Sequence, residues 1–129
     1  MNEDFVSFDL AKKLKKKGFP QYTEKSYFVG DHKKRMCSVG TFLHVHTQNT
    51  EHLIAAPTIA QVLKWLRDCN AIHIHICLYS KGWYCDVYTF EYYEEDKEYG
   101  VKHNVQFDEF STYEEAALAG IEYALDIVI

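Results

Sequence analysis

Two pairs of histidines are the residues of this sequence best placed to do chemistry. The members of each pair are separated by one residue, at His44 and His46 and at His73 and His75. Because alternate residues of a β-strand point to the same face, either pair could bind one metal ion through both imidazoles. Asp86 or His103 could complete such a site. The spacing allows a small metal-dependent enzyme, although neither pair contains a carboxylate.

Other catalytic patterns have less support. The chain contains no G-x-S-x-G sequence, and its six glycines are scattered singly rather than grouped to hold a phosphate. Its four cysteines form no CxxC pair, and none has a histidine in an obvious activating position. We therefore expect buried free thiols and no cofactor, and we favour a non-enzymatic role, with the small metal-dependent enzyme as the alternative.

Size and charge limit the remaining classes of function. A chain of 129 residues with 47% hydrophobic residues is most simply a single domain, residues 1–129. No apolar run reaches the roughly 20 residues that span a bilayer, and the acidic start MNEDFVSFDL does not resemble a signal peptide. We expect a cytoplasmic protein without membrane contact. The net charge of −5 argues against general nucleic-acid binding.

One basic patch is an exception to that charge. It lies in a helix that we expect to begin after Ser7, an N-cap residue, and to end at Gly18, with Pro20 preventing continuation. The helix dipole stabilises cations in the last turn, so one interpretation of the patch is a solvated helix face. The alternative interpretation is a nucleic-acid surface. The candidate nucleic-acid contacts are Lys12, Lys13, Lys16 and Lys17.

Two further helices have clear start signals. Thr58 with Gln61 matches a capping box, and Ser111 and Thr112 stand three residues before Glu114 and Glu115 in two overlapping ones. Between them, we expect strands near residues 72–79, 83–90 and 101–107, and earlier ones at 26–29 and 36–46. Residues 91–98 form a charged connection in this interpretation.

The predicted hairpin turn is Lys81-Gly82. That turn would set Tyr79 opposite Tyr84, Cys77 opposite Asp86 and His75 opposite Tyr88. The element order α-β-β-α-β-β-β-α then predicts a two-layer α+β domain. It would have an antiparallel sheet of about four to five strands and three helices, mainly on one face of the sheet.

The face of the sheet away from the helices has an unusual predicted composition. An open face commonly carries Thr, Lys, Glu and Ser, whereas this one carries rings that combine flat apolar area with a polar tip. We interpret it as a surface for a protein partner or for a second copy of the chain. The candidate contacts are His73, His75, Tyr79, Tyr84, Asp86 and Tyr88, and the same face would include His44, His46, Phe90 and Tyr92.

Three stretches together resemble a known group of proteins: VSFDLAKKLKKKGFPQ, IAAPTIAQVLKWLRDCNAIHI and FSTYEEAALAGIEYAL. In this respect the chain is similar over nearly its full length to small uncharacterised proteins of gut Bacteroidetes and their phages or mobile elements. The resemblance implies an intracellular protein, with a phage origin as one alternative. It implies no particular activity.

The order helix, three strands, helix in residues 58–128 also resembles double-stranded-RNA-binding domains. That family grips phosphates with lysines at the start of its last helix. The matching residues here, Thr112-Tyr113-Glu114-Glu115-Ala116, are acidic, which argues against RNA binding by that mode. The last helix is also similar to the end of HicB-type antitoxins, which neutralise a protein partner.

Overall fold

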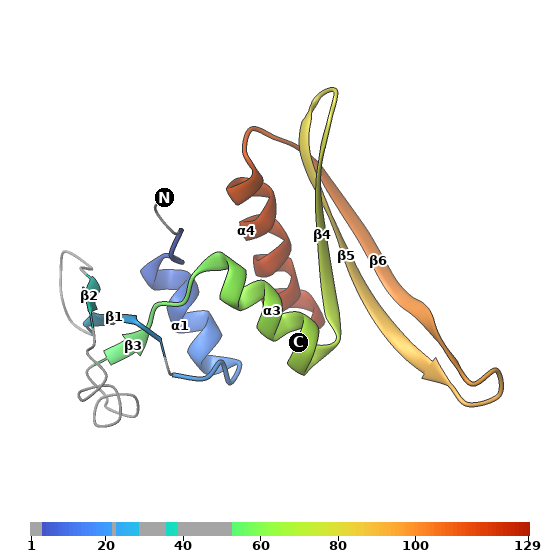
Figure 1. Ribbon diagram of the computed structural model, residues 1–129, viewed down its shortest axis with the longest axis horizontal. Helices are drawn as coiled ribbons and strands as arrows, with labels where there is room; N and C mark the ends of the chain where they lie inside the picture. Colours follow the sequence, from blue (N-terminus) through green and yellow to red (C-terminus); the bar gives the residue numbers. More distant parts are fainter. Residues whose placement is uncertain (1–3, 22, 29–35, 39–52) are drawn as a thin grey trace. The chain divides into compact units, whose positions relative to one another are not determined.

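The computed structural model describes residues 4–21, 23–28, 36–38 and 53–129 (Figure 1). Within these residues the chain has three α-helices and six strands, which form two antiparallel sheets. The predicted α+β class is confirmed, with two three-stranded sheets in place of one larger sheet. The chain divides into two compact units, residues 1–58 and residues 59–129.

The first unit contains one helix and a small sheet. Its elements are α1 (Phe8–Lys16), β1 (Lys25–Phe28), β2 (Met36–Ser38) and β3 (Leu53–Ala55). The strand order is β2-β1-β3, and both pairings are antiparallel. β3 is a strand that the sequence did not predict. The strand predicted at residues 36–46 is present at 36–38, and the rest of that range, with His44 and His46, lies outside the described residues.

The ends of α1 form as their residues predict. The Ser7 hydroxyl accepts a hydrogen bond from the Leu10 amide at 3.2 Å. At the other end, Gly18 has a φ of +90°, and the Phe19 amide donates to the Leu14 carbonyl at 2.9 Å. This is a Schellman ending, in which glycine takes the left-handed position without steric cost.

The second unit places two helices on one face of a three-stranded sheet (Figure 1). It contains α3 (Ile59–Asn70), β4 (Ile72–Tyr79), β5 (Gly82–Tyr93), β6 (Glu98–Phe110) and α4 (Tyr113–Tyr123). A π-helical turn, η1 (Ala124–Val128), continues α4. The sheet order β4-β5-β6 and the order helix, three strands, helix both follow the prediction.

The start of α4 forms one half of the predicted Thr112–Glu115 capping box, because the Glu115 side chain bonds to the Ser111 amide rather than to that of Thr112. The Thr112 hydroxyl accepts from the Glu115 amide at 3.1 Å, and the Glu115 carboxylate accepts from the Ser111 amide at 3.1 Å. Two amide donors at the helix start are thereby satisfied, and the carboxylate also lies at the positive end of the helix dipole.

Aliphatic side chains and small helical residues form the core of the second unit. Gly120 of α4 faces the sheet so closely that a Cβ there would lie 2.8 Å from the Ile74 Cγ2 and 3.4 Å from the Cys85 sulfur. The fully buried residues of this core include Val62, Leu66, Ile72, Cys85, Val87, Ala116, Ala117, Ile121 and Leu125.

The hairpin register between β4 and β5 differs from the predicted one by two residues. Tyr79 pairs with Gly82, and Ser80 and Lys81 make the turn, so the prediction of Lys81-Gly82 as the turn is wrong. Because the shift is even, every side chain keeps its predicted face and only its partner changes. The observed pairs on the open face are His73 with Tyr88, His75 with Asp86 and Cys77 with Tyr84.

The second hairpin is longer than predicted. β5 continues to Tyr93 and β6 begins at Glu98, so the expected connection of residues 91–98 reduces to residues 94–97. The pairing of β5 with β6 shifts register twice, between Trp83 and Cys85 and between Thr89 and Phe90. Figure 1 shows this hairpin extending beyond the ends of α3 and α4.

Burial of Cys85 makes a pH-dependent contribution to stability. Removal from solvent and the negative charge of Asp86 raise the pKa of the Cys85 thiol from 9.0 to about 11. Because the pKa of this thiol is higher in the folded state, its contribution to stability is complete below pH 9 and is lost as the pH rises towards 11. We expect the free energy of unfolding to fall over this range by about 2 to 3 kcal/mol more in the wild type than in Cys85→Ala. Denaturant titrations of both proteins at each pH test this, and parallel curves would contradict it.

Candidate functional site

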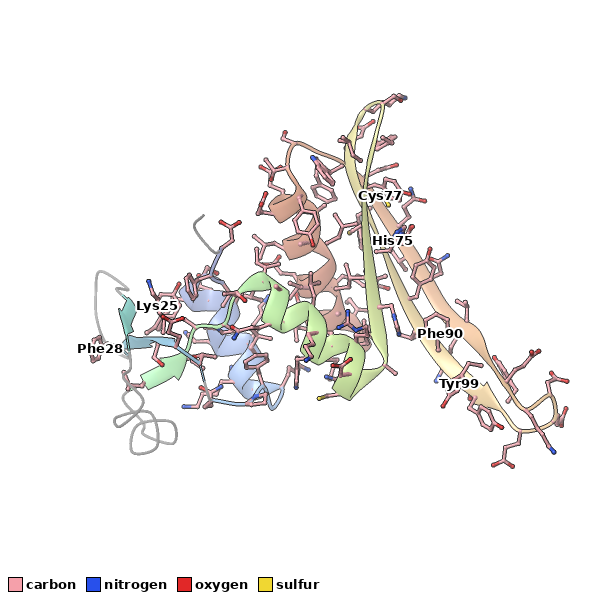
Figure 2. All side chains as sticks on the ribbon, in the orientation of Figure 1. Lys25, Phe28, His75, Cys77, Phe90 and Tyr99 are labelled. Carbon is pink, nitrogen blue, oxygen red and sulfur yellow. The ribbon has the colours of Figure 1, made fainter. Side chains whose placement is uncertain are left out.

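The open face of the second sheet carries the predicted set of rings. Ile72 is buried towards the helices, and His73 and His75, the next residues of the opposite face, are exposed. Directly paired residues of neighbouring strands share a face, so the observed register places the remaining members beside them. We define the aromatic face as His73, His75, Cys77, Tyr79, Tyr84, Asp86, Tyr88 and Phe90. Figure 2 labels three of these residues, which lie on the side of the sheet away from α4.

Ring contacts order both ends of the aromatic face. At one end, the His73 ring meets Phe90 edge to face with centroids 5.0 Å apart, and Tyr88 lies 6.3 Å from the same Phe90. At the other end, Tyr79 and Tyr84 make an edge-to-face pair at 5.4 Å. Each such pair fixes side-chain orientation and contributes roughly 0.5–1.5 kcal/mol. The rings are therefore held in place before any ligand arrives.

Polar groups lie between these two ring clusters. The Tyr88 hydroxyl donates to an Asp86 carboxylate oxygen at 3.2 Å. The Cys77 sulfur lies 3.2 Å from the His75 Nε2. The pKa of Tyr84 is raised mainly by its hydrogen bond with Cys77 and, to a smaller extent, by the charge on the Cys77 sulfur. The pKa of Tyr88 is raised mainly by desolvation and then by the charge of Asp86. Both phenols are therefore protonated at neutral pH and can donate hydrogen bonds.

The contact between Cys77 and His75 corrects one expectation. The sequence suggested that no cysteine had an activating histidine, yet the structure brings this imidazole to hydrogen-bonding distance of the thiol. The signal was present in the sequence, because residues two apart on a strand share a face. His75 and Cys77 have the same spacing of two residues as the members of each histidine pair.

An exposed arm continues the aromatic face along the second hairpin. We define the distal arm as residues 90–101. Tyr92 and Tyr99 pair across its strands with centroids 5.0 Å apart, and their side chains are 47% and 72% exposed. Sequence reasoning assigned most of this arm to a loop, although Phe90 with Tyr92 and Tyr99 with Val101 already show strand alternation. Its carboxylates are Glu91, Glu94, Glu95, Asp96 and Glu98.

A shallow apolar groove lies where the distal arm meets the end of α3. Its volume is about 380 Å³. The lining residues are Arg67, Ala71, His73, Phe90 and Tyr99. The groove combines the methyl group of Ala71, three rings and one cation, which together suit one large side chain of a ligand.

The structure gives the metal interpretation little geometric support. His73 and His75 do share a face, but His73 contacts Phe90 and His75 contacts Cys77. In the described parts of the chain, no three His, Cys, Asp or Glu side chains cluster closely enough to hold a metal ion. His44, His46 and the side chain of His103 lie outside the described set, so a site that includes them stays a prediction.

Three of the predicted lysines lie on α1, and Lys17 is the residue that follows it. Lys12, Lys16 and Lys17 are exposed and Lys13 is partly buried. The Lys12 ammonium lies 5.4 Å from the centre of the Phe8 ring, a cation–π contact within the helix itself. A cation that rests on its own helix fits the solvated-face interpretation.

The chain matches no protein-family model, no curated protein and no solved structure. None of the helices in the described residues is long and apolar enough to cross a membrane.

Proposed function

We propose that the protein is a cytoplasmic, non-enzymatic binding module that engages a protein partner through the aromatic face. The observation that carries this proposal is an open sheet face whose rings pack on one another and still contact solvent. Tyrosine and similar amphipathic rings dominate the energetic centres of protein interfaces, because they bury a large area while losing few rotamers. A face built for solvent alone would not need this composition.

The groove beside the distal arm supports the same function. Protein interfaces concentrate their binding energy where an anchor side chain enters a desolvated pocket. Here Phe90, Tyr99 and Arg67 all line the groove. An aromatic or aliphatic side chain of the partner would fill the groove while the partner covers the rings around it.

Charge indicates the kind of partner. The distal arm carries five carboxylates, and only Lys97 opposes them between Glu91 and Val101. A basic protein surface complements that charge, and complementary charge raises the association rate as well as specificity. A second copy of this chain meeting the same face would bring the same carboxylates into a two-fold interface. Nucleic acid would meet the arm with its own negative charge.

Serine substitution of two rings tests the surface. In Tyr84→Ser with Tyr88→Ser we expect partner capture to weaken at least about tenfold, because the double change removes one ring from each of the two ring clusters of the aromatic face. The measurement is the amount of each protein retained by immobilised wild type and variant, quantified by mass spectrometry. Light scattering of the purified chain determines whether the retained species is instead a second copy.

A matched variant controls for the loss of a tyrosine. Tyr113→Ser removes a ring that contacts Trp83 and lies at the start of α4, outside the aromatic face. We expect it to retain the partner as the wild type does. If the double variant keeps its circular dichroism spectrum and still captures the partner, the aromatic face is not the binding surface.

A further inference from the structure

We infer that Cys77, together with His75, forms a thiol–imidazole site on the aromatic face that is oxidised by hydroperoxides. The site consists of a nucleophile, a base and a hydrogen-bonding phenol drawn from two strands. The Cys77 sulfur lies 3.2 Å from Nε2 and 3.8 Å from Nδ1 of the same imidazole. A nucleophile and a base within hydrogen-bonding reach are the recognisable arrangement of an activated thiol.

Strand geometry holds this pair together. Cys77 and His75 are two residues apart on β4, so their side chains rise from the same face of the sheet. Tyr84 is the cross-strand partner of Cys77 and Asp86 is the cross-strand partner of His75. Tyr84 also hydrogen-bonds with Cys77.

The position also admits a small oxidant. Cys77 is partly exposed and His75 is exposed, so a hydroperoxide can reach the sulfur without opening the fold. The other described cysteines differ. Cys85 is fully buried, and Cys69 is exposed on α3, where none of the described side chains is seen to hydrogen-bond with it.

The reaction follows from these groups. The Cys77 thiol transfers its proton to His75, and the thiolate attacks the terminal oxygen of the hydroperoxide. A sulfur–oxygen bond forms as the oxygen–oxygen bond breaks, so sulfur loses two electrons and the peroxide gains them. The leaving alkoxide, or hydroxide from hydrogen peroxide, takes the proton from the imidazolium. The products are a sulfenic acid at Cys77 and an alcohol or water.

Site-resolved trapping of the sulfenic acid tests the proposal. The purified full chain is treated with hydrogen peroxide in the presence of dimedone, and labelling of each cysteine is followed by mass spectrometry. We expect Cys77 to be labelled about tenfold faster than Cys69, because the adjacent imidazole can accept the thiol proton as the sulfur attacks. Equal rates at the two cysteines would overturn the proposal.

Two glutamine variants isolate the role of the imidazole. His75→Gln should slow the labelling of Cys77 to the rate of Cys69, whereas Lys81→Gln, which alters the exposed turn of the same hairpin, should leave it unchanged. An unchanged Cys77 rate in His75→Gln would equally overturn the proposal. Labelling of Cys85 reports loss of the fold in either variant, because that thiol is inaccessible in the native chain. In that event the wild-type comparison of Cys77 with Cys69 decides the proposal.

Discussion

Replacing Gly82 with alanine should lower the free energy of unfolding by about 4 kcal/mol, the largest effect we expect from a single methyl group in this protein. Gly82 begins β5 with a φ of +129°, which residues with a side chain rarely adopt. A Cβ at this position would also lie 2.6 Å from the Phe110 carbonyl oxygen. That oxygen belongs to the backbone of β6, so the contact is relieved only by displacing a strand.

Equilibrium denaturation of the wild type and Gly82→Ala measures this cost. Gly100→Ala provides the control, since the atoms nearest to its Cβ would belong to the exposed ring of Tyr93, which can rotate away. We expect that control to change stability by less than about 1 kcal/mol. Equal midpoints for Gly82→Ala and Gly100→Ala would show that the close approach of β5 to β6 is not required.

Gly120→Val should destabilise the second unit by about 3 kcal/mol, because α4 packs on the sheet through the missing side chain of this glycine. The new Cβ would come within 2.8 Å of Ile74, whose Cγ2 is fixed to a branched carbon and cannot turn away without changing its rotamer. The added methyl groups would displace α4 from Ile74 and Cys85.

The matched change for this prediction is Glu122→Val, which places the same side chain on an exposed position of the same helix. It should cost less than about 1 kcal/mol, mostly through helix propensity. Thermal and denaturant unfolding of both variants provide the comparison. A Gly120→Val protein as stable as Glu122→Val would mean that α4 does not pack on the sheet at this point.

Local interactions explain what could be predicted from the sequence. The ends of α1 depend on Ser7 and Gly18, and the start of α4 depends on Thr112 and Glu115, all of which bond within a few residues. The two faces of β4 follow from simple alternation, and a register shift of two residues leaves each side chain on its predicted face. All six candidate partner contacts therefore lie on the predicted face. The α+β class follows from the order of the elements.

The remaining features depend on contacts between distant residues. Ser80-Lys81 and Lys81-Gly82 are both plausible turns, and the choice between them is made by pairing along all of β5. Strand β3 has only three residues and forms against β1, so its own sequence carries little signal. The cooperation of Cys77 with His75 was visible in principle, but it required treating a thiol and an imidazole on one strand as a pair. The origin of the gene in gut bacteria or their phages stays a prediction.

The second register shift in the long hairpin, between Thr89 and Phe90, has a consequence for how this protein can change over time. Beyond it, β5 and β6 extend past the ends of α3 and α4, and past the groove at Phe90 and Tyr99 the tip of the hairpin is held by strand pairing (Figure 1). Substitutions there are distant from the helix–sheet core, so their energetic effects add to those in the core rather than combining with them. Lineages could exchange tyrosines and carboxylates at the tip, or lengthen the hairpin by residue pairs, and so acquire new partners while inheriting an unaltered fold.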